Sequence, residues 1–318
     1  MTLTGRARHG HSVCFSPFAR DRFACVAGQN YGLSGVGTLY IIRSQERHLV
    51  ELASREWRDM LFDVAWSEEA DGVLVTASGD GSLQLWDIGR PELESVEIFN
   101  EHGQEVASVD WTKVRSAPQH FLSSSWDGSL KLWDPNRRES LNTYLGHSGI
   151  VYETVWSPSV AGLFASVGSD QTLALWSVKH SLPHPVQQFR AHDGEVLSCD
   201  WSKYDENILV TASVDQLVRG WDVRNITSPV FSLSGHTMAV RKVRCSPHER
   251  NLLASCSYDF SVRTWDVCQR DSLLETFVHH PEFTIGLDFN LHIKGEVVDC
   301  SWDETVCVYM PRSLSQPK

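Results

Sequence analysis

The sequence has 318 residues, of which 42% are hydrophobic, so the chain can form a substantial core and does not have the composition of a disordered protein. Lys and Arg total 28 against 40 Asp and Glu, and the net charge of −12 argues against nucleic acid or an anionic membrane as the partner, because phosphate groups attract basic surfaces. No apolar run is long enough to span a bilayer, which argues against direct membrane insertion, and the N-terminal MTLTGRARHGHSV lacks the apolar core of a signal peptide.

The first segment of the chain, residues 9–56, is predicted to be a degenerate copy of a repeating unit. Residues 13–17 (VCFSP) follow the pattern of 155–158 (VWSP), and 37–42 (GTLYII) follow that of 81–86 (GSLQLW). Internal repeats of this length indicate a repeat architecture and therefore decide the fold.

Six clearer repeats follow the first segment. We place them at residues 57–101, 102–146, 147–191, 192–235, 236–279 and 280–310. An Asp recurs six residues before a Trp at Asp80 and Trp86, Asp127 and Trp133, Asp170 and Trp176, Asp215 and Trp221, and Asp259 and Trp265, with Asp303 and Tyr309 in the last repeat. A His recurs every 44 or 45 residues, at His102, His147, His192, His236 and His280.

Each repeat reads as four short strands separated by turn residues. In the third repeat we expect strands at 106–112, 121–126, 130–134 and 140–145. A period near 44 residues with four strands is typical of WD repeats. The predicted fold class is therefore all-β, a single seven-bladed WD-repeat β-propeller. The last repeat ends after three strands, so we expect its outer strand to come from N-terminal residues 2–6, with 312–318 as the alternative donor.

The resemblance to WD-repeat proteins implies that the recurring His, Asp and Trp share a hydrogen-bond network with a strand Ser or Thr. We expect such networks at His102, Asp127 and Trp133; His147, Asp170 and Trp176; His192, Asp215 and Trp221; and His236, Asp259 and Trp265. Because the set recurs in repeat after repeat, we interpret it as structural and not catalytic. Trp57 replaces the His in the second repeat and Val36 the Asp in the first, so these two blades should depend more on packing.

No pattern of enzyme chemistry stands apart from these repeats. The Gly-rich stretch 28–37 (GQNYGLSGVG) lacks the strand-then-helix context of a dinucleotide loop and reads as an elongated turn. The eight cysteines are scattered and none forms a CxxC pair, so we expect buried reduced thiols and no clustered metal ligands. The sequence predicts no enzyme activity, no metal and no cofactor.

Several segments resemble the peroxin-7 family, the WD-repeat receptors for the type-2 peroxisomal targeting signal. They include 61–68 (LFDVAWSE), 79–87 (GDGSLQLWD), 254–260 (ASCSYDF) and 300–305 (CSWDET). The resemblance implies a soluble receptor that binds an N-terminal amphipathic helix of the form Arg-Leu, five residues, His or Gln, then Leu. It further implies cargo such as thiolase, a co-receptor like the long form of the type-1 signal receptor, peroxisomal docking proteins, and shuttling between cytosol and peroxisome matrix. The alternative is a generic WD-repeat scaffold subunit of another complex.

One face of the predicted propeller gathers acids and aromatic residues, because the loop after the recurring His and the turn at the recurring Asp meet there. The expected signal-binding residues are Asp59, Glu105, Trp126, Glu195, Tyr258, Glu282 and Trp302. Asp59 and Glu105, on adjacent blades, are expected to bind the Arg of the signal. The alternatives are solvated carboxylates for the acids, packing between blades for Tyr258 and Trp302, and either a structural or a functional role for Asp63.

Overall fold

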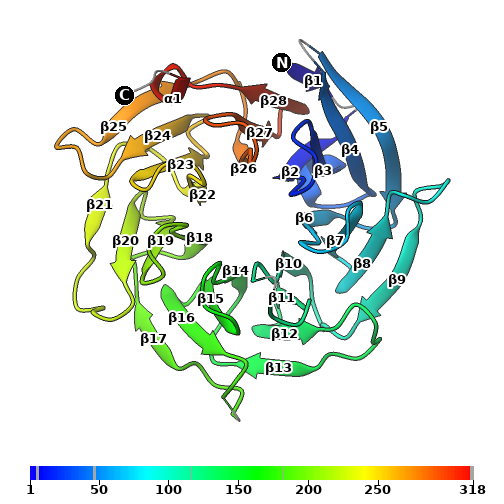
Figure 1. Ribbon diagram of the computed structural model, residues 1–318, viewed down its shortest axis with the longest axis horizontal. Coiled ribbons are helices and arrows are strands. Elements are labelled where there is room, and N and C mark those ends of the chain that lie inside the picture. The colour runs from blue at the N-terminus through cyan, green and yellow to red at the C-terminus, as the bar shows by residue number, and fades with distance from the viewer. Residues whose placement is uncertain (5–6, 46–47, 115, 181, 316–318) are drawn as a thin grey trace.

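Seven four-stranded antiparallel sheets form a ring around a central axis (Figure 1). The computed structural model describes residues 1–4, 7–45, 48–114, 116–180 and 182–315. Within these residues the chain is an all-β, seven-bladed propeller, as the repeats predict, with only a 3₁₀ turn and one short helix besides the strands. No helix among them is long and apolar enough to cross a membrane.

The first four blades each run from an innermost to an outermost strand. The first blade contains β2 (His9–Phe15), β3 (Arg22–Gly28), β4 (Gly37–Gln45) and β5 (His48–Trp57), with η1 (Asn30–Gly32) between β3 and β4. The second contains β6 (Leu61–Trp66), β7 (Val73–Ser78), β8 (Ser82–Asp87) and β9 (Ser95–Asn100). The third contains β10 (Val106–Trp111), β11 (Phe121–Ser125), β12 (Ser129–Trp133) and β13 (Asn142–Leu145). The fourth contains β14 (Val151–Trp156), β15 (Leu163–Gly168), β16 (Thr172–Ser177) and β17 (Gln187–Arg190).

The last three blades repeat this order, except that the seventh is completed from the other end of the chain. The fifth contains β18 (Val196–Trp201), β19 (Ile208–Ser213), β20 (Val218–Asp222) and β21 (Phe231–Leu233). The sixth contains β22 (Val240–Cys245), β23 (Leu252–Ser257), β24 (Val262–Asp266) and β25 (Leu273–Phe277). The seventh contains β26 (Thr284–Phe289), β27 (Val297–Ser301), β28 (Thr305–Tyr309) and β1 (Thr2–Thr4), and α1 (Arg312–Ser315) follows it.

The ring closes through β1, which pairs with β28 in the register Thr2 to Cys307 and Leu3 to Val306. The terminal amine of Met1 also donates to the Val308 carbonyl at 2.7 Å. The closing strand thus comes from the N-terminus, the donor that the sequence analysis favoured, whereas residues 312–315 form α1. Residues 5 and 6 of the expected strand, and 316–318 of the alternative donor, lie outside the described residues.

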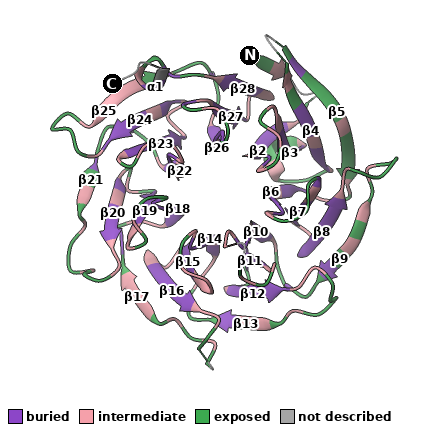
Figure 2. Ribbon diagram, in the orientation of Figure 1, coloured by how far each residue is buried: buried purple, intermediate pink, exposed green. Residues whose placement is uncertain are grey.

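The hydrophobic core lies between blades, where each sheet packs both of its faces on its neighbours. The second and third strands are accordingly runs of small and apolar residues, such as VLVTAS in β7 and LLASCS in β23. One cluster joins β7 and β8 of the second blade to β10, β11 and β12 of the third, and it contains Trp111, Phe121 and Trp133. Figure 2 shows the burial concentrated in the inner strands, while the outer strand β5 is mostly exposed.

The hydrogen bonds of the fourth blade show how the recurring polar residues hold a blade together. His147 Nδ1 lies 2.9 Å from the Asp170 carboxylate, and His147 Nε2 lies 2.7 Å from Ser166 Oγ. The carboxylate can only accept, so Nδ1 donates to it, and Nε2 accepts from the hydroxyl of Ser166. Trp176 Nε1 then donates to Ser166 Oγ at 2.8 Å. Equivalent bonds join His102, Asp127, Ser123 and Trp133; His192, Asp215, Thr211 and Trp221; and His236, Asp259, Ser255 and Trp265.

The second blade, which we expect to depend more on packing, still keeps part of this network. Trp57 Nε1 donates to Asp80 Oδ2 at 3.2 Å, and Arg58 Nε donates to the same oxygen at 2.6 Å. An indole N–H can do what the missing His Nδ1–H would have done, so the turn Asp is still satisfied. Trp86 Nε1 also still donates to a strand hydroxyl, that of Thr76, at 2.9 Å.

Carboxylates on the innermost strands connect each blade to the next. Asp63 accepts the Val109 backbone N–H at 3.1 Å and the Ser12 hydroxyl at 2.7 Å, so its role is structural. Asp110, Glu153, Asp200 and Asp288 make the same kind of bond to Trp156, Cys199, Cys245 and Phe15. Because these bonds cross blade boundaries, they fix the height of one blade against its neighbour.

The eight cysteines are all free thiols, but they are not all buried as expected. Six are buried, Cys14 is half-buried and Cys268 is exposed. Cys268 follows β24 in a surface turn, where no neighbouring blade covers it.

Candidate functional site

One face of the ring carries the tight turns between the second and third strands, at 79–81, 126–128, 169–171, 214–216, 258–260 and 302–304, and we call it the turn face. In six blades the residue before the turn Asp donates its backbone N–H to the residue that precedes the innermost strand. The pairs are Gly79 and Met60, Trp126 and Glu105, Ser169 and Ile150, Val214 and Glu195, Tyr258 and Ala239, and Trp302 and Phe283, with distances of 2.8–3.1 Å. These bonds bring the two sets of predicted site residues together around the central axis.

Aromatic rings on the turn face form a connected series that we call the aromatic belt. It consists of Trp126, Phe62, His11, Trp302, Phe283, Tyr258 and Tyr31. Ring centroids are 6.1 Å apart for Trp126 and Phe62, 5.7 Å for Phe62 and His11, and 6.0 Å for His11 and Trp302. The belt therefore crosses from the third blade, through the second and first, to the seventh and sixth.

The far end of the belt joins the last two blades to the first. Phe283 lies 5.2 Å from Trp302 and 4.8 Å from Tyr258, and Tyr31 lies 5.5 Å from Trp302. Trp302 and Tyr258 thus do pack between blades, yet both stay only half-buried. Tyr31 is in the 28–37 stretch, which is an elongated turn containing η1, and its side chain is 48% exposed.

Two nitrogens of the belt have no hydrogen-bond partner among the described residues. They are Trp302 Nε1 and His11 Nε2, and both atoms are buried. Burial is the main cause that lowers the pKa of His11 to about 3, and the charge of Arg241 is the second. The imidazole is therefore neutral at physiological pH. The belt is therefore an apolar surface with unused polar atoms beneath it.

The predicted acids surround the belt, but their surroundings differ. Asp59 is half-buried, lies beside Phe62 against Gly79, and accepts the Met60 N–H at 2.7 Å. Glu105 is half-buried, and its carboxylate has no hydrogen-bond or ion-pair partner in the described part of the chain. Asp59 therefore borders the belt at Phe62, and Glu105 adjoins it through the backbone bond to Trp126 at 2.9 Å.

The other two acids lie farther around the ring. The Glu195 carboxylate accepts the Tyr152 hydroxyl at 2.7 Å, so part of its bonding capacity is already used. Glu282 is exposed and adjoins Phe283 in the chain. The structure therefore places Asp59 and Glu105 at the Trp126 end of the belt and Glu282 at the Phe283 end, whereas Glu195 lies in the fifth blade and is bonded to Tyr152 of the fourth.

Sequence reasoning missed four residues of this face, namely His11, Tyr31, Phe62 and Arg241. Three of them occupy one repeat position, the second residue of the innermost strand or its equivalent after the β-bulge. This position holds His11, Phe62, Ala107, Tyr152, Leu197, Arg241 and Ile285. Aligning that position across the repeats would have found them, because it marks the rim of the central opening.

The opposite end of the central channel is charged and serves the fold. Glu153 is buried, with Lys242 Nζ at 2.7 Å and Arg244 NH1 at 3.1 Å. Burial by itself raises the pKa of Glu153, but the charges of Lys242 and Arg244 lower it to about 2. A carboxylate held ionised by the buried Lys242 and the half-buried Arg244 links the fourth blade to the sixth.

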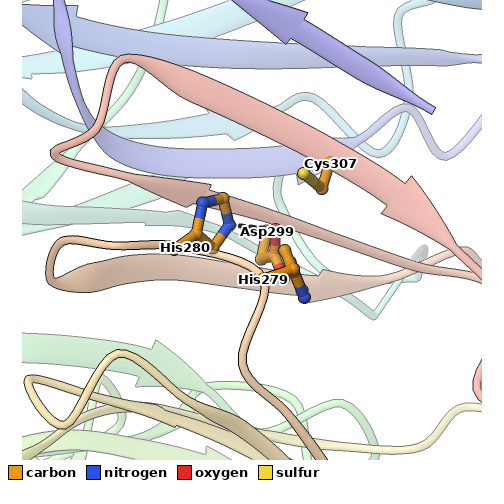
Figure 3. A group of neighbouring side chains, drawn as sticks. All are labelled: His279, His280, Asp299 and Cys307. Carbon is orange, nitrogen blue, oxygen red and sulfur yellow. Dashed lines mark hydrogen bonds and ion pairs between the residues drawn. The ribbon is translucent and has the colours of Figure 1, made fainter.

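The seventh blade contains a group that contradicts our expectation of no clustered metal ligands. His279, His280, Asp299 and Cys307 lie with one potential ligand atom from each within 4.8 Å of all the others (Figure 3). Burial acts to lower the pKa of both imidazoles, but hydrogen bonds to Asp299 raise it to about 9 for His279 and, with Asp303, to about 11 for His280. Burial acts to raise the pKa of the Cys307 thiol, but the two imidazoles lower it to about 7.

Comparison with known proteins relates the whole chain to one group. The sequence model of the WD domain, G-beta repeat, matches residues 93–134, 138–177, 183–222 and 227–266. The chain is 50% identical to the mouse peroxisomal targeting signal 2 receptor, over 99% of this chain and 98% of the mouse chain. It is 42% identical to Arabidopsis thaliana peroxisome biogenesis protein 7, over 95% of each chain, and 32% identical to the Saccharomyces cerevisiae peroxisomal targeting signal 2 receptor, over 94% of this chain and 96% of the yeast chain.

Among solved structures, the WD40 β-propeller domain of Doa1 superimposes with a TM-score of 0.80. The match covers 98% of this chain and 97% of that domain at 18% identity, so it bears on the fold alone.

Proposed function

The chain belongs to the WD40-repeat family of peroxisomal targeting signal 2 receptors, and we propose that its turn face is the surface that holds the signal. The observation that carries this proposal is the aromatic belt, bordered at one end by the Asp59 carboxylate and by Glu105, whose backbone carbonyl accepts the Trp126 N–H. A propeller that acts by binding needs an apolar, partly exposed surface with a few polar anchors, and the belt has both.

The chemistry of the belt suits an amphipathic helix. The leucines of a signal of the form Arg-Leu, five residues, His or Gln, then Leu would lie along one side of such a helix and pack on Trp126, Phe62 and Trp302. Its Arg would then lie near Asp59 and Glu105, where a charge-assisted hydrogen bond contributes about 1.5–3 kcal/mol. The buried N–H of Trp302 is a further donor for a polar group of the ligand.

The turn residue after the Asp has a left-handed backbone in several blades, and in the sixth blade this residue is aromatic. Phe260 follows the turn Asp of the sixth blade with a φ of 69°, and its ring stacks on Phe283 with centroids 5.7 Å apart. The left-handed conformation costs a bulky residue about 1–2 kcal/mol. Gly81 and Gly128 occupy the same turn position without this cost, so the sixth blade keeps a ring and loses some stability.

The test is a double-mutant cycle between receptor and peptide. Glu105→Gln and Asp59→Asn change the charge of each side chain while keeping its shape, and Asn retains an oxygen for the Met60 N–H. In the presence of purified co-receptor, each variant should weaken binding of the Arg-containing signal peptide by about 10-fold or more, and should not weaken binding of the Arg→Ala peptide. Glu206→Gln, an exposed acid in the β18–β19 loop of the opposite face, is the matched control.

Equal losses for the two peptides would show that the acids do not meet the Arg of the signal. A wild-type receptor that bound both peptides equally would overturn the proposal altogether.

The remaining features of the proposed role follow from the family. We propose that the chain acts by binding and not by catalysis, since the recurring His and Asp of the third to sixth blades are joined with a strand Ser or Thr in the structural networks. Cargo such as thiolase, a co-receptor resembling the long form of the type-1 signal receptor, and peroxisomal docking proteins are the proposed partners. A receptor of this kind would move between the cytosol and the peroxisome matrix.

A further inference from the structure

The hydrogen-bond network of the seventh blade differs from that of the other blades. His280 Nδ1 is bonded to the turn Asp of its own blade, Asp303, at 2.7 Å, which is the kind of bond made by the other recurring His residues. Its Nε2, however, lies 3.0 Å from a second carboxylate, that of Asp299. Asp299 stands where the second to sixth blades have a Ser or Thr, and Tyr309 stands where they have a Trp. The Tyr309 hydroxyl donates to Asp299 at 2.8 Å. A buried carboxylate thus replaces a neutral hydroxyl, a change that the fold by itself does not require.

Two further side chains complete this group. His279 Nε2 lies 2.9 Å from the other oxygen of Asp299, and the Cys307 thiol approaches both imidazoles from β28. Figure 3 shows the two imidazoles and Asp299 gathered beside the strand that carries Cys307. His280, Asp299 and Cys307 are buried, whereas the His279 side chain is 29% exposed and provides a route from solvent.

We propose that His279, His280, Asp299 and Cys307 bind a zinc ion in the seventh blade. Two imidazoles, one carboxylate and one thiolate are all ligand types that zinc accepts, and four ligands complete its tetrahedral shell. Zinc would displace the Nε2 protons that His279 and His280 donate to Asp299, and the thiol proton of Cys307, because only the deprotonated groups bind the metal. Bond lengths of about 2.0–2.3 Å place tetrahedral ligand atoms about 3.3–3.6 Å apart. The observed set, within 4.8 Å, needs to contract by about 1 Å at its widest to meet that spacing.

The surrounding residues are those expected around a zinc site. A zinc-bound His usually donates its second N–H to a carboxylate, which orients the ring, and Asp303 stands at that place beside His280 Nδ1. The Tyr309 hydroxyl on Asp299 orients the carboxylate ligand in the same way. This second set of contacts is independent of the four ligands themselves.

The position of the site gives the ion a structural role. Cys307 is the residue of β28 that pairs with Thr2 of the closing strand, and the Thr2 hydroxyl lies 3.5 Å from its sulfur. His279 and His280 lie in the loop that connects the sixth blade to the seventh, and Asp299 lies on β27. An ion at this point would join three segments of the blade at which the ring closes, and it would stabilise that closure by favouring the folded state.

The test uses the full chain, stripped with a chelator and titrated with zinc against a chromophoric competitor. We expect one zinc per chain, a higher melting temperature with zinc, and a sulfur-to-metal charge-transfer band when cobalt replaces zinc. Cys307→Ser should remove that band and weaken zinc binding by at least about 100-fold, since loss of an outer-shell contact alone costs 10–100-fold. Cys268→Ser, at the exposed cysteine, is the matched control and should leave both unchanged.

A measurement on the wild-type chain guards against a variant that does not fold. Zinc should slow alkylation of Cys307, read by peptide mass spectrometry, and should leave alkylation of Cys268 unaffected. Absence of stoichiometric zinc, or zinc binding that survives Cys307→Ser with its cobalt band intact, would overturn the proposal. In either case the four residues would be an ion-paired cluster that holds no metal.

Discussion

Trp126→Ala should weaken binding of the signal peptide, because Trp126 is the most exposed aromatic side chain beside the two acids. It is 36% exposed, and a Trp offers about 250 Å² of surface, so a ligand that covers it would bury about 90 Å². At about 25 cal/mol per Å² this burial contributes about 2 kcal/mol, which corresponds to a loss of about 30-fold in affinity. The change should leave the fold intact, since Trp126 lies at the surface at one end of the belt, where its ring contacts that of Phe62.

The assay is fluorescence anisotropy of a labelled signal peptide, with purified receptor and co-receptor, over a range of receptor concentrations. The control is Tyr204→Ala, which removes a ring that is 46% exposed from the β18–β19 loop on the opposite face. Thermal unfolding of both variants separates lost binding from lost structure.

Binding of the peptide by Trp126→Ala within about twofold of wild type would refute this expectation, and so would an equal loss for Tyr204→Ala. A melting temperature of Trp126→Ala low enough to account for the lost binding would refute it as well. After any of these results, contact between the ligand and this end of the belt would no longer explain the affinity.

Two predictions concern the fold. Glu153→Gln should destabilise the protein by about 3–5 kcal/mol at neutral pH, because the buried Lys242 and the half-buried Arg244 both lose this carboxylate. The folded pKa of Glu153 is about 2 against an ordinary 4.5. The stability advantage of wild type over the variant, measured by urea unfolding at each pH, should therefore be complete above about pH 5 and shrink as the pH falls from 4.5 towards 2. A stability difference that stayed constant with pH would contradict this reasoning. Gly128→Ala should lower the free energy of unfolding by about 1–2 kcal/mol, because Gly128 has a φ of 84°. Gln216→Gly, at the same turn position with a φ of 73°, should leave the free energy of unfolding unchanged or raise it by about 0.5 kcal/mol. Denaturant midpoints that ranked the two variants the other way would disprove the role of backbone strain.

Much of this protein could be predicted from residue spacing alone. The His, Asp and Trp positions recur at nearly constant intervals because every blade needs the same polar network between the same apolar strands. That periodicity predicts the number of blades, the turn positions and the face on which Trp126, Asp59 and Glu105 meet. The family resemblance could likewise be recognised from motifs outside the shared network.

Contacts between different blades could be decided only by the tertiary structure. Phe62, His11 and Trp302 belong to three blades, and no spacing along the chain says that their rings touch. The same holds for the indole of Trp57, which takes over the hydrogen bond of a missing His.

The four proposed zinc ligands illustrate the limit most clearly. His279 and Cys307 are 28 residues apart and match no metal motif, since their meeting depends on how the β25–β26 loop crosses the third strand of the seventh blade. The sequence by itself determined the ring, because local periodicity and burial dictate each blade. Only the tertiary structure decided which side chains share a belt, a channel or a ligand shell, because those contacts arise from the curvature and closure of the ring.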